Sequence, residues 1–469
     1  MVEHDEVLMS TTKGFTCRHL LTSLLVAALV ICATVNTSVA LHTSPVSPTH
    51  VITDVPYVSQ ETDFFCAFAS TTMVLQYYDV NTSLHEVLYN SGSGYSLVYS
   101  TPYLPRLPVG IIGTGKWTQD RQFLASLYGL HYENWLADQQ LSEQDKWELY
   151  WTHLQEHISA DKPVITNLNP MVLPSMRDAI RLELGIPVRF PRINTWLWEH
   201  LPVYLYHAIV IVGVNATDNT VCIHDPAAGI YQHPEQGTYR WMPAEQLRKG
   251  NKDLSEFNPW MSYSIELFSN ITEEPLNTTE IFHQVHTRNL QRLQGKPDVY
   301  DPHLSVNWSC NTFGINTIRA VANSTEQGRS RVSTALLYKL LLQYHMYPLE
   351  YRVFSVLDDI YPEVFDIPTH LNTVNHYREI AIEKQTMASY LYSIHPLLTN
   401  ASLADICLYD AQLLEEEADL WFAMATNYSL FLQKGLFLFI PQGIKALTAV
   451  HEHAEQAIDI EQQLLHYAS

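Results

Sequence analysis

The sequence predicts an α+β domain followed by an all-α domain, and three stretches carry this prediction. From Cys66 to Tyr78 an apolar run places its bulky residues at helical spacing, which predicts a helix with the cysteine in its first turn. Two apolar segments, 206–214 and 220–226, are separated by a short polar turn and predict a β-hairpin. Beyond about residue 270 turn residues become rare and 3.6-residue periods dominate, so helices are expected there.

These observations divide the chain into parts. Its 469 residues suffice for two or three domains with substantial cores. We expect a signal peptide over 1–40, an α+β domain over 41–268 and a helical domain over 269–469. In the last part the strongest helical patterns cover residues 333–347, 374–394, 403–425 and 444–466.

The signal peptide is predicted from the order of charge, apolar run and small residues. Lys13 and Arg18 precede an apolar run over 20–35 that is short for a membrane span. Ser38-Val39-Ala40 then offers small residues at the two positions that a signal peptidase reads. We therefore expect a secreted, extracytoplasmic protein. The acidic residues near the first methionine are atypical of such a segment and leave an uncleaved membrane anchor as the alternative.

Eight N-x-S/T sequons are spread over the predicted mature chain and favour an exported glycoprotein. They lie at Asn81, Asn215, Asn270, Asn277, Asn307, Asn323, Asn400 and Asn427. The net charge of −22, from 27 basic and 49 acidic residues, argues against nucleic acid or an anionic membrane surface as a partner.

Four polar residues at the ends of predicted elements point to nucleophilic catalysis. A helix N-terminus stabilises a thiolate, so Cys66 becomes a nucleophile once a base stands beside it. His207 begins one strand of the hairpin and Asp225 ends the other, so a carboxylate can hold the imidazole in one tautomer. Taken singly, a core cysteine or core histidine is the commoner interpretation. Together with Gln60, which precedes Cys66 by six residues, the set is much less expected by chance.

This pattern resembles the papain-like cysteine peptidases of the bacteriocin-leader-processing, C39-like family, over about residues 50–268. The family shares the Gln-to-Cys spacing, the His-apolar-Gly strand, an Asp-Pro strand end and a Lys-Pro-Val strand, here at Lys162. The resemblance implies that Cys66 is the nucleophile and His207 the general base and acid. It further implies that Asp225 orients His207, and that the Gln60 side chain forms the oxyanion hole with the Cys66 backbone N–H. A peptide or protein is the implied substrate.

The chain departs from this family at Ala67-Phe68, where a Gly-Pro or Gly-Tyr pair is usual, and a side chain there is expected to narrow the approach to the site. A weaker similarity to the butirosin-biosynthesis acyltransferase group rests on the cysteine region, on 91–95 and on the two-domain layout. Acyl transfer is therefore the alternative to hydrolysis. A binding module that has kept the fold is a third interpretation, and the intact Gln-Cys-His-Asp set argues against it.

The remaining cysteines and histidines are given structural roles. Cys222 alternates with apolar residues and predicts a core position, whereas Cys310 and Cys407 could pair in an oxidising compartment. No Cys/His spacing indicates zinc, so no metal and no other cofactor is expected. The pairs His283/His286 and His451/His453 are interpreted as surface histidines.

Two further predictions concern buried carboxylates and irregular segments. Asp410 and Glu417 share the apolar stripe of 403–425 and need partners if buried, which favours hydrogen-bonded structural residues. The segment 91–117 is rich in Gly, Pro, Ser and Tyr and predicts an irregular loop beside the cleft. A second such insertion, 170–203, precedes His207.

Overall fold

The computed structural model describes most of the chain after residue 48. The described ranges are 49–62, 65–100, 111–114, 118–173, 206–230, 237–255, 261–270, 275–296, 312–326, 367–431 and 440–467. The predicted signal segment, the helix 333–347, Cys310 and most of the 170–203 insertion lie outside these ranges. Residues 48–469 form one compact unit. We call 49–270 the sheet domain and 275–467 the helical domain.

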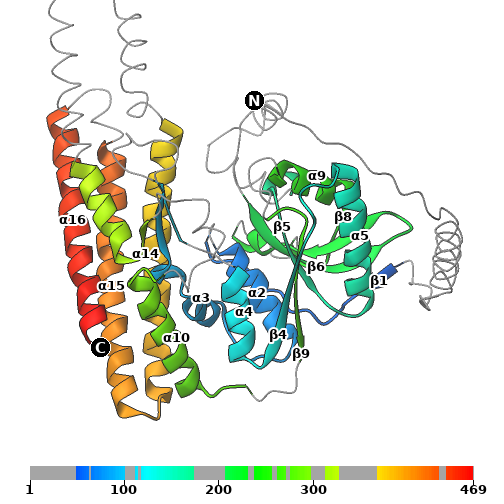
Figure 1. Ribbon diagram of the computed structural model, residues 1–469, viewed down its shortest axis with the longest axis horizontal. Helices are drawn as coiled ribbons and strands as arrows, with labels where there is room; N and C mark the ends of the chain where they lie inside the picture. The colour runs from blue at the N-terminus through cyan, green and yellow to red at the C-terminus, as the bar shows by residue number, and fades with distance from the viewer. Residues whose placement is uncertain are drawn as a thin grey trace, which may run out of the picture. The chain divides into compact units, whose positions relative to one another are not determined.

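An antiparallel sheet of seven strands forms the centre of the sheet domain (Figure 1). Six strands follow the order β4-β9-β5-β6-β7-β8, and β1 pairs with the end of β6. Their bounds are β1 Thr49–Val51, β4 Leu130–Leu136, β5 Val164–Leu168, β6 His207–Asn215, β7 Thr220–His224, β8 Arg240–Pro243 and β9 Ser264–Asn270. The predicted hairpin is β6 and β7, and it is confirmed, with Val210 opposite His224 in the register.

Helices cover both faces of this sheet, which explains why β5 is buried along its whole length. On one face, Cys66 and Ala67 of α2 (Cys66–Tyr77) contact Ala208 of β6. On the other, Tyr150 of α5 (Glu143–Ser159) donates a hydrogen bond of 3.0 Å to the Thr166 hydroxyl of β5. The remaining helices of the domain are α3 Leu84–Ser91, α4 Thr118–Leu127 and α9 Ala244–Ser255, with short 3-10 turns η1 Ser93–Tyr95, η2 Pro170–Val172 and η3 Pro226–Gly229.

The sequence explains where several of these helices begin. The predicted helix at Cys66 is confirmed, and its first ten residues are buried because apolar side chains surround it on all sides. Other helices, three of them in the first 300 residues, begin at side-chain caps, which accept a hydrogen bond from a backbone N–H near the start of the helix. These caps are Ser83 for α3, Ser142 for α5 and Asn277 for α10 (Thr278–Leu293).

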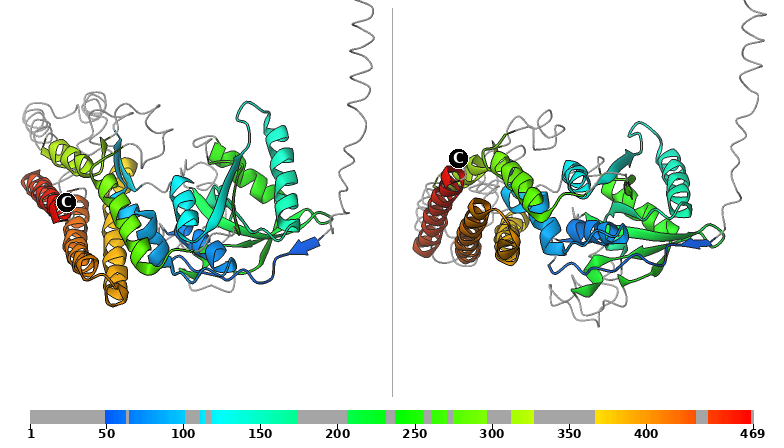
Figure 2. Two further views of the ribbon diagram at one scale, coloured as in Figure 1. Left: turned by 60° about the horizontal axis from the view of Figure 1, so that its bottom comes forward. Right: turned by 90° about the horizontal axis from the view of Figure 1, so that it is seen from below.

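The helical domain is built around three long helices that lie side by side (Figures 1 and 2). These are α14 Ile367–Ile394, α15 Ala401–Leu430 and α16 Ile440–Tyr467, with the turn η6 His395–Leu397 between the first two. Helix α10 and a helix over 315–326 complete the described part. The predicted α+β domain followed by a helical domain is thereby confirmed. The boundary at residue 268 stays a prediction, because one apolar core includes residues of both domains.

In its described part, residues 91–100 and 111–114, the segment 91–117 is not the irregular cleft loop that the sequence suggested. Its described residues form β2 (Leu97–Ser100) and β3 (Ile111–Thr114), which make a second sheet with β10 (Thr312–Phe313) of the helical domain. This hairpin packs against α14, not beside Cys66. The turn into it needs Gly92, whose φ of +71° is costly for other residues. Local composition signalled the turn but not the long-range strand partner.

Buried charges in the helical domain are paired, as predicted for Asp410 and Glu417. Asp410 lies 2.8 Å from His286. That histidine is only 6% exposed, so the prediction that it lies on the surface was wrong. Glu417 accepts a hydrogen bond of 2.9 Å from the Trp421 indole, and lies 2.7 Å from the ammonium of Lys384. Lys384 also binds Glu461 at 2.9 Å, and all three charged side chains are fully buried.

The cysteines in the described ranges, Cys66, Cys222 and Cys407, are buried, and none of them is part of a disulfide there. Cys222 lies in the core as predicted, and burial raises the pKa of its thiol to about 12. Cys407 donates a hydrogen bond of 3.4 Å to the Leu391 carbonyl in the core of the helical domain. That position counts against the predicted pairing with Cys310, which lies outside the described ranges.

Candidate active site

Cys66 is the first residue of α2 and only 4% of its surface is exposed. Most of the residues that follow it are apolar, so the helix inserts into the core, and its N-terminus lies against Ala208 at the start of β6. Backbone N–H groups of the first turn point toward this end of the helix and carry partial positive charge. The position therefore favours the ionised thiolate over the thiol.

His207 and Asp225 meet at the ends of β6 and β7. The His207 Nε2 atom lies 2.8 Å from Asp225 Oδ1, and the two side chains are 3% and 0% exposed. The same carboxylate oxygen accepts a hydrogen bond of 3.0 Å from the Ala227 backbone N–H, because Asp225 caps the 3-10 turn that begins at Pro226. The carboxylate is thus held in one orientation by the Asp-Pro turn and in turn fixes the imidazole.

The electrostatics of His207 connect it with Cys66 as well as with Asp225. Burial alone would lower the pKa of the imidazole, but hydrogen bonds to Asp225 and Cys66 and the negative charges of both raise it from 6.5 to about 10. Since Nε2 is engaged by Asp225, Nδ1 is the ring nitrogen left for the Cys66 sulfur. The arrangement favours an imidazolium between a thiolate and a carboxylate.

Gln60 is buried in the turn that precedes Cys66. Its side-chain amide donates a hydrogen bond of 2.9 Å to the Thr62 carbonyl, which uses one of the two amide N–H groups. Its backbone N–H donates to the Pro226 carbonyl at 3.0 Å, so the segment before Cys66 is joined to the residue after Asp225. The structure places Gln60 on the short turn before Cys66, and its amide retains one N–H for another acceptor.

Two residues that the sequence did not single out hold these segments together. The Ser70 hydroxyl of α2 donates a hydrogen bond of 3.1 Å to the Ala208 carbonyl, one residue after His207. The Tyr57 hydroxyl donates to the Asp225 carbonyl at 3.0 Å, and burial together with the Asp225 charge raises the pKa of the phenol to about 12. Nothing local indicated where the hydroxyls bind.

The polar groups near Cys66 can be compared with the ligand sets that hold metal ions. Within the described ranges, no three His, Cys, Asp or Glu side chains are grouped closely enough to hold a metal ion. The polar groups around Cys66 are instead a thiol, an imidazole, a carboxylate and an amide, which together suit attack on a carbonyl carbon.

Comparison with known proteins gives one match, and it covers the site. No curated protein matches the chain. Residues 52–248, which include Gln60, Cys66, His207 and Asp225, match the model of the Peptidase_C39 like family. The similarity to the butirosin acyltransferase group is not seen in these comparisons. Over these residues the sheet domain is similar to the C39-like peptidases, and the match supports a place for this domain in that family.

Proposed function

We propose that the protein hydrolyses amide bonds of a peptide or protein with Cys66 as nucleophile, His207 as general base and acid, and Asp225 as the residue that orients His207. The observation that carries the proposal is the position of His207, a buried imidazole that lies 2.8 Å from Asp225 and whose pKa is raised by its hydrogen bonds to Asp225 and to Cys66. A thiolate–imidazolium pair of this kind is reactive near neutral pH without a metal ion.

In the proposed reaction the Cys66 thiolate attacks the scissile carbonyl carbon and forms a tetrahedral oxyanion. The His207 imidazolium donates its proton to the departing amine, and the C–N bond breaks to leave a thioester on Cys66. Water then attacks the thioester while neutral His207 accepts its proton, which releases the carboxylic acid and restores the pair. Asp225 stays ionised throughout and holds the imidazole in the tautomer that the cycle needs.

The Gln60 amide and the Cys66 backbone N–H are the proposed oxyanion donors. Support comes from the place of Gln60 on the turn before α2, and from an amide N–H that Thr62 does not use. Such donors stabilise charge that develops only in the transition state. They are therefore expected to affect turnover more than they affect substrate binding.

The site is also proposed to act outside the cytoplasm. Five of the sequon asparagines are exposed, as an attached glycan requires, and they are Asn81, Asn270, Asn277, Asn323 and Asn400. The predicted signal segment lies outside the described residues, and no described helix has the length and apolar character needed to cross a bilayer. The proposal is tested by endoglycosidase treatment of the protein from its native host, which is expected to lower the apparent mass on a denaturing gel. A mass equal to that of the unmodified full chain would contradict it.

The function is tested by incubating the purified chain with a peptide library, with and without an excess of amine acceptor. The wild type is expected to hydrolyse peptides in both cases. Hydrolysis should vanish in Cys66→Ala and persist in the control Cys407→Ala, which removes a buried thiol of the helical domain. Product that forms only with an acceptor, or only from carrier-bound thioesters, would favour acyl transfer. Full activity in Cys66→Ala would refute the assignment of the nucleophile.

A further inference from the structure

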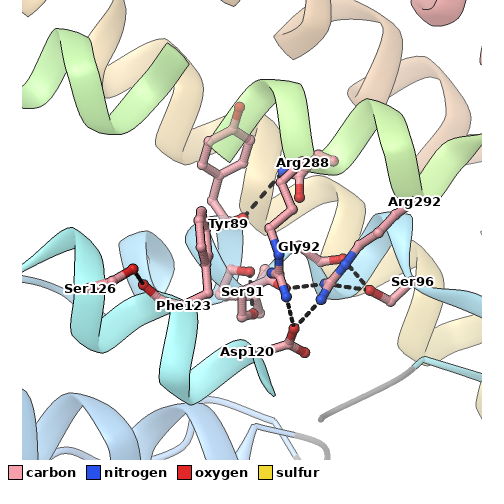
Figure 3. Close-up of polar contacts among 11 residues, drawn as sticks. Tyr89, Ser91, Gly92, Ser96, Asp120, Phe123, Ser126, Arg288 and Arg292 are labelled. Carbon is pink, nitrogen blue, oxygen red and sulfur yellow. Dashed lines mark hydrogen bonds and ion pairs between the residues drawn. The ribbon is translucent and has the colours of Figure 1, made fainter. Parts of the chain in front are cut away.

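Asp120 and Arg121 are neighbours in the first turn of α4, yet they bind different parts of the molecule. Asp120 Oδ1 accepts a hydrogen bond of 2.7 Å from Arg288 of α10, and also pairs with Arg292 of the same helix. Figure 3 shows the two guanidinium groups converging on this one carboxylate. Asp120 is 3% exposed, so the contact between the domains at this point is a buried ionic one.

Arg292 is itself fixed by contacts to the sheet domain. Its side chain is fully buried and binds the Ser91 carbonyl, together with the Ser96 hydroxyl at 2.6 Å (Figure 3). Helix α10 approaches so closely here that a Cβ on Gly92 would lie 2.2 Å from the Asn289 side chain. The helix therefore fits against α3 and α4 in one register, and this register determines where Asp120 is held.

Arg121 reaches in the other direction, to α2. Its Nε donates a hydrogen bond of 3.1 Å to the Thr71 hydroxyl, and its terminal nitrogen pairs with Glu266 of β9. The Thr71 hydroxyl donates in turn to the Ala67 carbonyl at 2.8 Å. A directed chain of hydrogen bonds thus runs from Arg121 through Thr71 to the carbonyl of Ala67, the residue after Cys66.

The charge of Arg121 also acts on Cys66. Burial lowers the pKa of the guanidinium, but Glu266, Tyr132 and the charge of Cys66 together raise it above its usual value. Such an interaction is mutual, so a cation stabilised by the thiolate also stabilises the thiolate. Glu266 reduces this effect because it partly neutralises the guanidinium. The hydrogen-bond chain through Thr71 is therefore the stronger connection.

We propose that Arg121 and Thr71 are positioning residues for Cys66, and that the helical domain holds them in place through the contacts of Arg288 and Arg292 with Asp120. This inference rests on the proposed function, because it assumes that the orientation of the first turn of α2 governs the reactivity of Cys66. It gives the helical domain a role in the chemistry that does not require it to touch the substrate.

The test uses the full chain and measures the rate of alkylation at Cys66 by iodoacetamide as a function of pH, with the modified residue mapped by mass spectrometry. Thr71→Val keeps the shape of the side chain but loses the hydroxyl, whereas Thr71→Ser keeps the hydroxyl. We expect Thr71→Val to lower the rate at mildly acidic pH by about 3- to 10-fold, the range that one hydrogen bond accounts for, and to raise the pH midpoint. Thr71→Ser should restore both. Arg121→Lys keeps the charge but loses the Nε–H donor, so its alkylation rate and pH midpoint should resemble those of Thr71→Val. It serves as the test variant if Thr71→Val does not fold.

The link to the helical domain is tested by Asp120→Asn against a matched control, Asp410→Asn. Each removes a buried carboxylate that α10 binds, but Asp410 has no connection to Arg121. Both variants are expected to lower the melting temperature, and Asp120→Asn alone to shift the pH midpoint. Equal shifts in the two variants, or a wild-type profile in folded Thr71→Val, would overturn this inference alone. A wild-type Cys66 that reacts as an ordinary thiol would overturn the proposed function as well.

Discussion

The Ser70 hydroxyl of α2 donates a hydrogen bond of 3.1 Å to the Ala208 carbonyl of β6. Ser70 lies one helical turn after Cys66, and Ala208 directly follows His207, so this bond joins the helix of the proposed nucleophile to the strand of the proposed base. Both residues are fully buried, which protects the bond from competition with water. A contact outside the candidate catalytic residues thus ties α2 to the start of β6.

Ser70→Ala is expected to lower peptide hydrolysis by about tenfold, with little change in KM, because a small misplacement of reacting groups affects the chemical step most strongly. Thr72→Val is the matched control. Its hydroxyl bonds to the Phe68 carbonyl at 2.8 Å within α2 and does not reach β6. Steady-state kinetics of the two variants are compared, and equal losses of kcat would show that the Ser70 bond has no special role.

Gln60→Ala is expected to lower kcat on the order of 100-fold or more, as removal of one oxyanion donor does elsewhere. Alkylation of Cys66 forms no oxyanion, so its rate at mildly acidic pH should stay close to that of the wild type. The two assays on the same variant separate oxyanion stabilisation from a general disturbance of the site. A parallel fall in both rates would contradict the role given to Gln60.

His207 predicts a loss of stability at alkaline pH. Its pKa of about 10 in the folded protein exceeds the ordinary value of 6.5, so the imidazolium stabilises the fold fully below about pH 6.5, and this stabilisation is lost as the pH rises toward 10. Each pKa unit corresponds to about 1.4 kcal/mol. Asp225→Asn removes one of the groups that raise the pKa, so urea unfolding between pH 6.5 and 10 should show a smaller decrease in this variant. An equal decrease would contradict the pairing.

His224 predicts a loss of stability at acidic pH. Burial lowers the pKa of this imidazole to about 4, and its ring packs edge-on against Tyr239 with centroids 4.5 Å apart. Because the unfolded chain takes up a proton near pH 6.5 and the folded one does not, stability falls as the pH drops from 6.5 toward 4. His224→Phe keeps an aromatic ring but removes the titrating group. The free energy of unfolding in urea should therefore decrease less between pH 6.5 and 4 in this variant. An equal decrease in the variant and the wild type would show that other groups cause the loss of stability at acidic pH.

Lys384 is expected to be among the most sensitive positions of the helical domain. It lies between Glu417 and Glu461 at 2.7 and 2.9 Å, and its loss would leave two buried carboxylates without a cation. Lys384→Met should therefore lower the free energy of unfolding by about 3–5 kcal/mol. Lys445→Met on the exposed surface of α16 is the control and should change it by less than about 0.5 kcal/mol. Similar values for both would refute the structural role of the cluster.

Periodicity and spacing predicted the elements that carry the candidate site. The run after Cys66 identified α2 with its first residue, and the apolar segments around residue 215 identified the β6–β7 hairpin, because each pattern is local and strongly periodic. What could not be predicted are contacts between distant segments. The pairing of β2 with β10, and the burial of His286 against Asp410, depend on partners more than 100 residues away.

The polar links around the site were missed for the same reason. Ser70, Thr71 and Arg121 look unremarkable in the sequence, since a serine or threonine in an apolar helix is usually explained by a hydrogen bond to its own backbone. Only the fold shows that Ser70 reaches β6, and that Arg121 bonds to a helix 50 residues earlier. The chain thus indicates the reacting groups in its motifs and leaves their positioning to long-range packing.

The central claim is that Cys66 and His207 form a thiolate–imidazolium pair, and the pH dependence of Cys66 alkylation tests it most directly. In the wild type we expect fast modification that maps to Cys66 and persists well below pH 8, where an ordinary thiol is protonated. In His207→Ala the rate at mildly acidic pH should fall sharply and its midpoint should move up toward that of a free thiol. A wild-type Cys66 that reacts no faster than a free thiol, with a profile unchanged by His207→Ala, would contradict the account.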